Sequence, residues 1–206
     1  MVRSGMADII KKLREELKDL NKKIQNHPSL QKPSRELLNR FVENQLYIIP
    51  HDLRALSHML STADVMDEVE FFKMLIDGDY EASKALARLA GELNIKLEYS
   101  RLSVKAVSYT HFLSWLALNA SPGDAAVALT VNLPVWGENL KRLREHAVSL
   151  NIKSTKLFDL FAGPFDTLEE KAEKIAERYL DWDRYRFIAN TIQKYELDFW
   201  DSLLED

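Results

Sequence analysis

The segment Ala189–Leu203 reads ANTIQKYELDFWDSL and has the spacing of a helix that buries one face. Apolar residues recur seven and four positions before Glu196 and three and seven positions after it, at Ala189, Ile192, Phe199 and Leu203. These positions share one helical face, so Glu196 is expected to be buried. A buried carboxyl group needs a partner or has a raised pKa, and such groups cluster at functional sites. Glu196 is therefore a candidate functional acid. The alternative is a structural acid paired with an Arg or Tyr.

Helical periodicity continues through the rest of the chain. Period-two alternation is scarce, and six glycines in 206 residues leave few positions for tight hairpins. We predict an all-α protein of about seven helices, with 1–206 as a single domain. The predicted helical segments have the approximate bounds 10–24, 33–60, 66–93, 103–119, 124–150 and 168–204.

Several breaks are expected inside these segments. Pro50 and Pro134 should kink their helices, because an internal proline frees a backbone carbonyl four residues upstream. Such kinks either open space for a ligand or curve a helix around the core. The third segment is expected to be broken or bent near 77–78, and the last to be interrupted near Asp181.

Charge and composition exclude several classes of protein. The formal net charge of -4, with no basic block, argues against a nucleic-acid partner or an anionic membrane surface. The most apolar stretch, 125–137, is too short to span a bilayer, and the charged N-terminal segment lacks a signal-like apolar region, so we expect a cytoplasmic protein. The chain has no cysteine, which excludes disulfides, thiolate metal sites and a cysteine nucleophile.

The second predicted helix carries polar groups at helical spacing. Asn44, Tyr47 and His51 follow each other at intervals of three and four, so an amide, a phenol and an imidazole share a face that could orient a small heterocycle. His58 extends this face, but no second segment offers paired acid and histidine ligands. We therefore expect neither a metal nor another cofactor.

Two further faces combine aromatic and polar groups. Tyr109 lies among apolar residues, a pattern more typical of plain core than of a ring-stacking surface. The last helix combines Glu196 with Tyr195, Phe199 and Trp200.

Motifs along nearly the whole chain resemble, in order, those of one family. They are His27-Pro28, Phe41–Tyr47 (FVENQLY), Phe71-Phe72 with Ala90–Ile95 (AGELNI), Tyr109–Leu113 (YTHFL), Leu133–Trp136 (LPVW) and Tyr195–Asp201 (YELDFWD), the last being the most specific. They are similar to motifs of the TenA/thiaminase II family and of its relative, the pyrroloquinoline-quinone synthase PqqC. The resemblance implies a haem-oxygenase-like helical fold. It also implies that Glu196 contacts the amino-heterocycle of a ligand, with Tyr109 and Phe199 as stacking walls and Tyr47 as a polar neighbour.

The chain departs from the family pattern at several positions. Asn44 stands where thiaminase II has an aspartate, although a one-residue slip would put Gln45 there. Val135 replaces the catalytic cysteine and Asn139 a supporting tyrosine. The family includes a cysteine-free branch in which glutamate chemistry replaces the thiol. One loop resembles a family loop that carries hydroxyl groups, but here it has phenylalanines without them, at Phe158, Phe161 and Phe165. This difference suggests a more apolar pocket.

The resemblance therefore implies a cysteine-free, TenA-like hydrolase. It would cleave a C–N bond in a thiamin-related aminopyrimidine during thiamin salvage, with Glu196 as general acid and base. One alternative is a non-catalytic protein that binds a small planar heterocycle. Another is a PqqC-like cofactor-free oxidase, favoured by Val42, Asn44 and Tyr47, although the chain lacks the cluster of basic residues that a carboxylated quinone requires.

The resemblance and the first amphipathic helix both suggest that the protein forms an oligomer. The family implies a homo-oligomer, a tetramer or dimer, and apolar residues exposed on the segment 10–24 would need a partner. Alternatively, this helix packs within its own subunit. We expect the ligand pocket between the second, fourth, fifth and last helices.

Overall fold

The computed structural model describes residues 8–205, in which all regular structure is helical. The all-α prediction is therefore confirmed; residues 1–7 and 206 of the predicted domain, including the start of the charged N-terminal segment, lie outside the described residues. The α-helices are α1 (Ile9–Glu16), α2 (Lys18–Gln25), α3 (Arg35–Ser61), α4 (Met66–Leu93), α5 (Val104–Asn119), α6 (Pro122–Val131), α7 (Leu133–Ser149), α8 (Lys156–Asp159), α9 (Asp166–Arg178) and α10 (Trp182–Ser202). Two 3-10 turns, Pro28–Leu30 and Tyr99–Arg101, complete the described structure.

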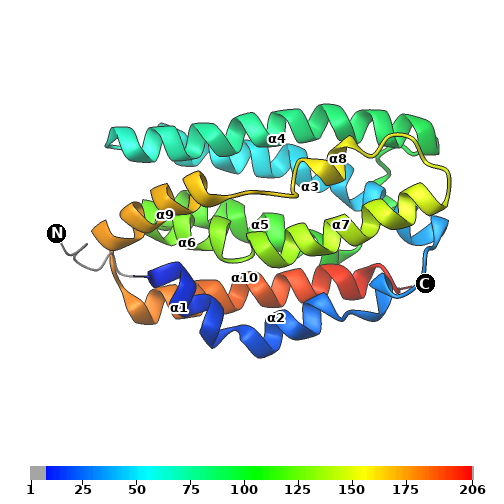
Figure 1. Ribbon diagram of the computed structural model, residues 1–206. Coiled ribbons are helices and arrows are strands. Elements are labelled where there is room, and N and C mark those ends of the chain that lie inside the picture. The colour runs from blue at the N-terminus through cyan, green and yellow to red at the C-terminus, as the bar shows by residue number, and fades with distance from the viewer. Residues whose placement is uncertain (1–7, 206) are drawn as a thin grey trace.

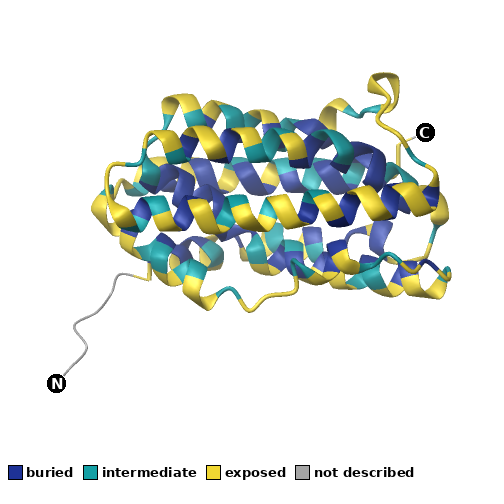
Figure 2. Ribbon diagram, turned by 90° about the horizontal axis from the view of Figure 1, so that it is seen from above, coloured by how far each residue is buried: buried dark blue, intermediate teal, exposed yellow. Residues whose placement is uncertain are grey.

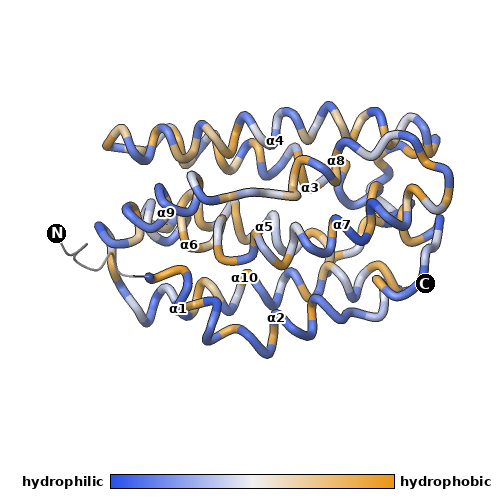
Figure 3. Tube along the Cα trace, viewed as in Figure 1, coloured by the Kyte–Doolittle hydropathy of each residue, from blue (hydrophilic) through white to orange (hydrophobic). Residues whose placement is uncertain are grey.

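The helices form an elongated bundle (Figure 1). The long helix α4 runs along one side, and α1, α2 and α10 lie on the opposite side, with the remaining helices between them. Exposed residues cover the outside of the bundle and buried residues its interior (Figure 2). Hydrophobic and hydrophilic residues alternate along each peripheral helix at the helical period (Figure 3), which explains why these segments fold with one face inward. No helix within residues 8–205 is both long and apolar enough to cross a membrane.

Local capping signals set several helix ends. The hydroxyl of Ser34 accepts from the backbone N–H of Leu37 at 3.3 Å and caps α3. Ser121 and Asp124 form a reciprocal capping box at the start of α6, and Asp181 caps α10. Each cap satisfies backbone donors that a helix leaves unpaired in its first turn.

The predicted segment 124–150 is two helices, because the chain turns at Asn132. Pro134 therefore lies in the first turn of α7 and does not kink a continuous helix. A proline is tolerated there because its missing N–H would be unpaired in any case. Pro50, by contrast, lies inside the unbroken helix α3.

The positions of the other helix breaks agree only in part with the prediction. The predicted helix 10–24 divides at Leu17 into α1 and α2, and α4 continues through Gly78 without the expected interruption. The expected break near Asp181 is confirmed, since α9 ends at Arg178 and α10 begins at Trp182.

The apolar residues of α1 are buried within their own subunit. Ile9, Ile10 and Leu13 pack into the core, as does Ile24 of α2. The exposed apolar surface that we expected on the segment 10–24 is therefore absent from its described part, and the argument for an oligomer drawn from this helix was wrong.

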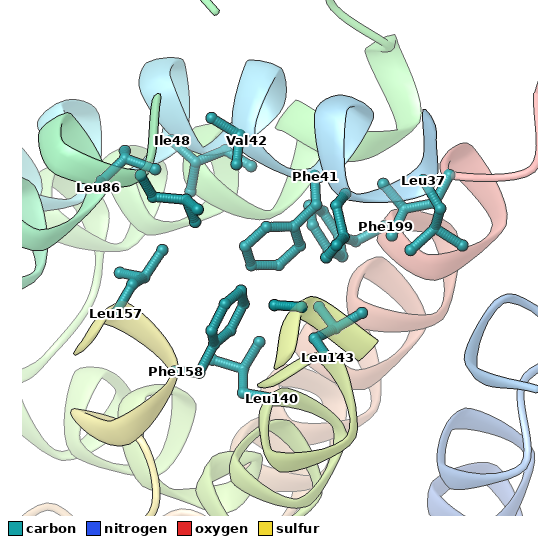
Figure 4. Packing of buried hydrophobic residues seen from close by; sticks show 14 of the residues in the cluster. Leu37, Phe41, Val42, Ile48, Leu86, Leu140, Leu143, Leu157, Phe158 and Phe199 are labelled. Carbon is teal, nitrogen blue, oxygen red and sulfur yellow. The ribbon is translucent and has the colours of Figure 1, made fainter. Parts of the chain in front are cut away.

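An aromatic cluster anchors one half of the core. Phe41 of α3 lies 5.8 Å from Phe199 of α10 and 5.9 Å from Phe158 of α8, between ring centroids. Figure 4 shows these three rings converging, with leucines of α3 and α7 around them. The cluster also includes Trp136, whose ring lies 5.4 Å from that of Phe199. These ring contacts connect α10 to α3 and α7 through Phe199, three residues from Glu196, while α10 itself packs mainly against α5 and α6.

Candidate functional site

A cavity of about 110 Å³ lies inside the bundle, bounded by α3, α4, α5, α6, α7 and α10. The helices that we expected around the pocket all contribute to it, and α4 adds a wall that the sequence did not predict. Seven of the sixteen lining residues are aliphatic. The others are the acids Asp52, Asp79 and Glu196, the amides Gln45 and Asn132, and the aromatic residues Tyr109, Trp136, Phe161 and Phe199.

Glu196 lies in this wall with 1% of its surface exposed. The indole N–H of Trp200 donates to its Oε1 at 3.5 Å, which is long for a hydrogen bond, and among the described residues Oε2 has no partner. Burial raises the pKa of Glu196 to about 8, against the opposing effects of Trp200 and Asn132. Neither an Arg nor a Tyr pairs with this carboxyl group within residues 8–205, so the structural alternative finds no support here.

The aromatic side chains provide flat walls around the same space. Tyr109 and Phe199, the two expected stacking residues, both line the cavity, and Trp136 and Phe161 join them. Burial, followed by the nearby Asp52 and Glu196 carboxyl groups, raises the pKa of Tyr109 well above its usual value. Its hydroxyl therefore stays protonated and is available as a donor.

The cavity-facing residues of α3 lie one position away from those that the sequence suggested. Gln45, Ile49, Asp52 and Leu56 are spaced by four, three and four residues and line the cavity. The predicted set begins at Asn44 and is rotated by about 100° around the helix axis. Gln45, the residue that a one-residue slip would place at the site, therefore lies at the cavity, and Asn44 does not.

Asn44 instead joins two helices. Its side-chain carbonyl accepts from the backbone N–H of Ser103 at 3.1 Å, and its amide donates to the carbonyl of Arg40 at 2.9 Å. Both polar groups are used, and Asn44 positions the start of α5 against α3.

We expect Gln45→Ala to affect ligand binding and Asn44→Ala to affect stability. Loss of Gln45 removes a polar group from the cavity and should weaken ligand binding without a large change in stability. Loss of Asn44 leaves the half-buried N–H of Ser103 without its partner and should lower the free energy of unfolding by about 1–3 kcal/mol, while ligand affinity is kept. Urea unfolding and ligand titration of both variants distinguish the two roles, and weaker binding in Asn44→Ala alone would contradict this assignment.

Tyr47 and His51 lie outside the cavity. Their rings stack at 4.0 Å, and the Tyr47 hydroxyl lies 2.9 Å from Nε2 of His111. The exposed Tyr99 ring meets Tyr47 edge-on. His58 is exposed near the end of α3. Tyr47, His51 and His111 form a surface cluster between α3 and α5. Tyr47 and His51 lie on the face of α3 next to the one that lines the cavity.

Val135 and Asn139 are also absent from the cavity wall. Val135 is part of the hydrophobic core, while its neighbours Leu133 and Trp136 face the cavity. The amide of Asn139 donates to the carbonyl of Ile24 at 3.3 Å and ties α7 to the end of α2. Neither position therefore presents a reactive group to a ligand in this arrangement.

Two acids in the cavity wall were not identified from the sequence. Asp52 of α3 accepts from the hydroxyl of Thr110 at 2.5 Å, and Asp79 projects from α4. Burial and then the Asp79 carboxylate raise the pKa of Asp52 well above its usual value, against the opposing Thr110 bond. Burial raises the pKa of Asp79 to about 7. The same reasoning that singled out Glu196, an acid at apolar helical spacing, applies to Asp52 between Ile49 and Leu56.

Residues 14–206 match the family model described as the TENA/THI-4/PQQC family. The chain belongs to this family. Because it contains no cysteine, it is a cysteine-free member. No protein with a curated description matches the sequence. The observed bundle has the haem-oxygenase-like helical fold of the TenA/PqqC superfamily, as predicted.

Solved structures of family members share this fold. A TenA homologue from Pyrococcus furiosus is similar with a TM-score of 0.78 at 21% identity, over 95% of this chain and 99% of its own. A TenA family transcription regulator from Silicibacter sp. TM1040 gives a TM-score of 0.78 at 16% identity, over 96% of this chain and 97% of its own. A TenA homologue from P. horikoshii OT3 gives 0.72 at 20% identity, over 95% and 97%. Similarity at this level of identity establishes the fold alone.

Proposed function

We propose that this TenA-family protein hydrolyses a C–N bond of a thiamin-related aminopyrimidine, in thiamin salvage, with Glu196 as general acid and base. The observation that carries the proposal is that Oε2 of the buried Glu196 has no partner within residues 8–205, in a cavity whose wall includes four aromatic rings. Such a cavity suits a planar heterocycle, and an unsatisfied carboxyl group suits its amino substituent. A cytoplasmic location is part of the same proposal.

The proposed reaction needs one group that is an acid and then a base. With its pKa near 8, Glu196 is largely protonated at neutral pH and donates its proton to the leaving nitrogen as the C–N bond breaks. The resulting carboxylate accepts a proton from the attacking water, whose oxygen forms the new C–O bond. The products are an alcohol or acid and an amine or ammonia, and Glu196 ends in its starting state.

Ammonia release is the direct test of this reaction. Purified protein should release ammonia from aminomethylpyrimidine or act on formylaminopyrimidine with repeated turnover. If either compound binds but neither is consumed, the protein is a binding protein for a small heterocycle, and the hydrolase proposal is wrong. The PqqC-like alternative is disfavoured by charge, because the described part of the cavity wall contains three acids and no Lys, Arg or His for a carboxylated quinone.

We also propose a homo-oligomer, a tetramer or dimer, but on a different surface from the first helix. Val104 and Leu118 of α5 are 81% and 69% exposed, Trp115 lies between them on the same face, and Phe187 of the adjacent α10 is exposed too. We call these four residues the α5 patch. A group of exposed apolar side chains of this kind is typical of a subunit interface.

Leu118→Glu is expected to dissociate this oligomer. A charge within an apolar interface is costly, whereas an exposed substitution in a monomer changes stability by less than about 0.5 kcal/mol. Sedimentation velocity at micromolar concentration should show an assembled wild type and a smaller Leu118→Glu species. Met66→Glu, at an exposed position on α4, is the matched control and should stay assembled. A monomeric wild type would refute the proposal.

A further inference from the structure

The cavity carries acids on two walls. Asp52 and Asp79 project from α3 and α4, and Glu196 from α10. The helices α4 and α10 lie on opposite sides of the bundle (Figure 1), so these acids face the cavity from different directions. The wall contains no Lys, Arg or His among the described residues. A ligand that fills this space therefore meets carboxyl groups on both sides and no compensating positive charge from the protein.

Elsewhere in the molecule, buried acids are paired with arginine. The fully buried Glu68 accepts from Arg178 at 2.8 Å and from the hydroxyl of Tyr179 at 2.9 Å. The buried Asp124 accepts from Arg184 at 2.6 Å. These pairs show how the fold compensates a structural carboxylate.

Asp52 and Asp79 are half-buried in the cavity wall, and neither has such a partner among the described residues. Asp52 has only the hydroxyl of Thr110, and no side chain in the described part of the chain forms an ion pair with either acid. The buried and unpartnered Oε2 of Glu196 in the same cavity is an independent sign that a donor is missing on the ligand side. Three incompletely satisfied carboxyl groups around one space indicate an occupant that supplies hydrogen-bond donors and positive charge.

We propose that Asp52 and Asp79 bind the ammonium group of the ligand, so that this cavity selects a protonated amine attached to an aromatic or heteroaromatic ring. This inference deepens the proposed function and rests on it for the identity of the ring. Within that function, it favours substrates with an aminoalkyl substituent over neutral analogues of the same shape. The ammonium group provides three donors, which suits two aspartates on adjacent helices. Before the C–N bond breaks it passes one proton to an ionised aspartate, so that the leaving nitrogen is neutral when Glu196 protonates it and departs as ammonia.

An organic cation fits this wall better than a metal ion. No group of three or more His, Asp or Glu side chains within residues 8–205 is placed to hold a metal. Apart from the acids and the amides Gln45 and Asn132, the wall is aliphatic and aromatic, and rings such as those of Trp136 and Phe199 can contact a ligand ring. Aromatic faces also attract organic cations.

Proton exchange supports the same assignment. Burial favours the neutral forms of both aspartates, and it raises the pKa of Asp79 to about 7. A bound ammonium group favours their ionised forms, so binding should release protons, and affinity should rise with pH near neutrality. The other titratable groups in the cavity are Tyr109 of α5, which stays protonated, and Glu196 of α10; the lining residues of α6 and α7 are uncharged.

Matched ligand pairs test the inference by isothermal titration calorimetry. The first pair is aminomethylpyrimidine and its hydroxymethyl analogue, measured in the Glu196→Gln background to prevent turnover. The second pair is benzylamine and benzyl alcohol, measured with the wild type. In both pairs the amine should bind at least about tenfold more tightly, the scale expected for a charge-assisted contact. Titration in two buffers of different ionisation enthalpy should show proton release for the amines only.

Asp79→Asn should reduce the preference for the amine to about threefold or less. Asp77→Asn, on the exposed side of the same helix and paired with Lys73, is the control and should keep the full preference. If Asp79→Asn does not fold, Asp52→Asn and the proton release of the wild type decide the question.

The outcomes separate the two proposals. Equal binding of amine and alcohol, or no proton release, overturns the cation site while leaving the hydrolase proposal open if the aminopyrimidines bind. A preference for benzylamine that depends on Asp79, without binding of either aminopyrimidine, supports the cation site and refutes the aminopyrimidine assignment. Failure of all four ligands to bind overturns both.

Discussion

Glu196→Gln should lower the rate of C–N bond hydrolysis by about 10²- to 10⁴-fold, the range that general acid and base catalysis usually contributes. The substitution keeps the shape of the side chain and the contact to Trp200 but removes the titratable proton. Aminopyrimidine affinity should therefore change much less than turnover. Steady-state ammonia release and ligand titration of the two proteins measure both quantities.

Asp198→Asn provides the control for this experiment. Asp198 lies two residues further along α10, is half-buried and does not line the cavity. Its substitution should leave turnover close to that of the wild type. If Glu196→Gln changes only the melting temperature while activity per folded molecule is kept, Glu196 is a structural acid and has no catalytic role.

The stability of the wild type should fall as pH rises from about 4.5 to about 8, and Glu196→Gln should remove much of this fall. Burial raises the pKa of Glu196 from 4.5 to about 8, so the unfolded chain loses its proton at a lower pH than the folded protein. The free energy of unfolding therefore decreases progressively between these two pH values and stays constant above them. A shift of this size corresponds to a loss on the order of several kcal/mol.

Urea unfolding at several pH values between 5 and 9 measures this effect. The difference in unfolding free energy between Glu196→Gln and the wild type should increase with pH up to about pH 8 and then level off. The difference isolates Glu196 from Asp52 and Asp79, which contribute to the wild-type profile in the same direction. A difference that does not vary with pH would show that Glu196 is ionised in the folded protein at neutral pH.

The helical fold and the position of Glu196 followed from the sequence because both depend on local periodicity. In α10, apolar residues flank Glu196 on one face and charged residues occupy the other, so the buried face is unambiguous. The family motifs extended this inference from single helices to the whole bundle. The expected stacking residues Tyr109 and Phe199 follow from the same motifs.

The cavity face of α3 could not be predicted in the same way. The first half of this helix is buried on several sides, including Phe41, Val42, Asn44 and Gln45 in succession. Where neighbouring faces are all buried, the hydrophobic pattern does not determine which one meets the cavity, and an error of one residue rotates the helix by about 100°. That rotation explains why Asn44 was chosen and Asp52 was missed.

Other differences arise from long-range packing. Asp79 reaches the cavity because α4 packs along α3, a contact between distant segments that no local pattern encodes. The break between α6 and α7 also lay beyond the pattern, since both flanking segments are apolar and only the position of Pro134 distinguishes a kink from a helix start.

A crystal structure of Glu196→Gln with aminomethylpyrimidine tests the central claim most directly. The substitution slows turnover, and the bound compound should lie in the cavity with its ring against Phe199 and Tyr109 and its aminomethyl nitrogen within hydrogen-bond reach of residue 196, Asp52 and Asp79. A cavity that stays empty at saturating concentration, or a ligand bound only outside it, would contradict the assignment of this cavity as the active site.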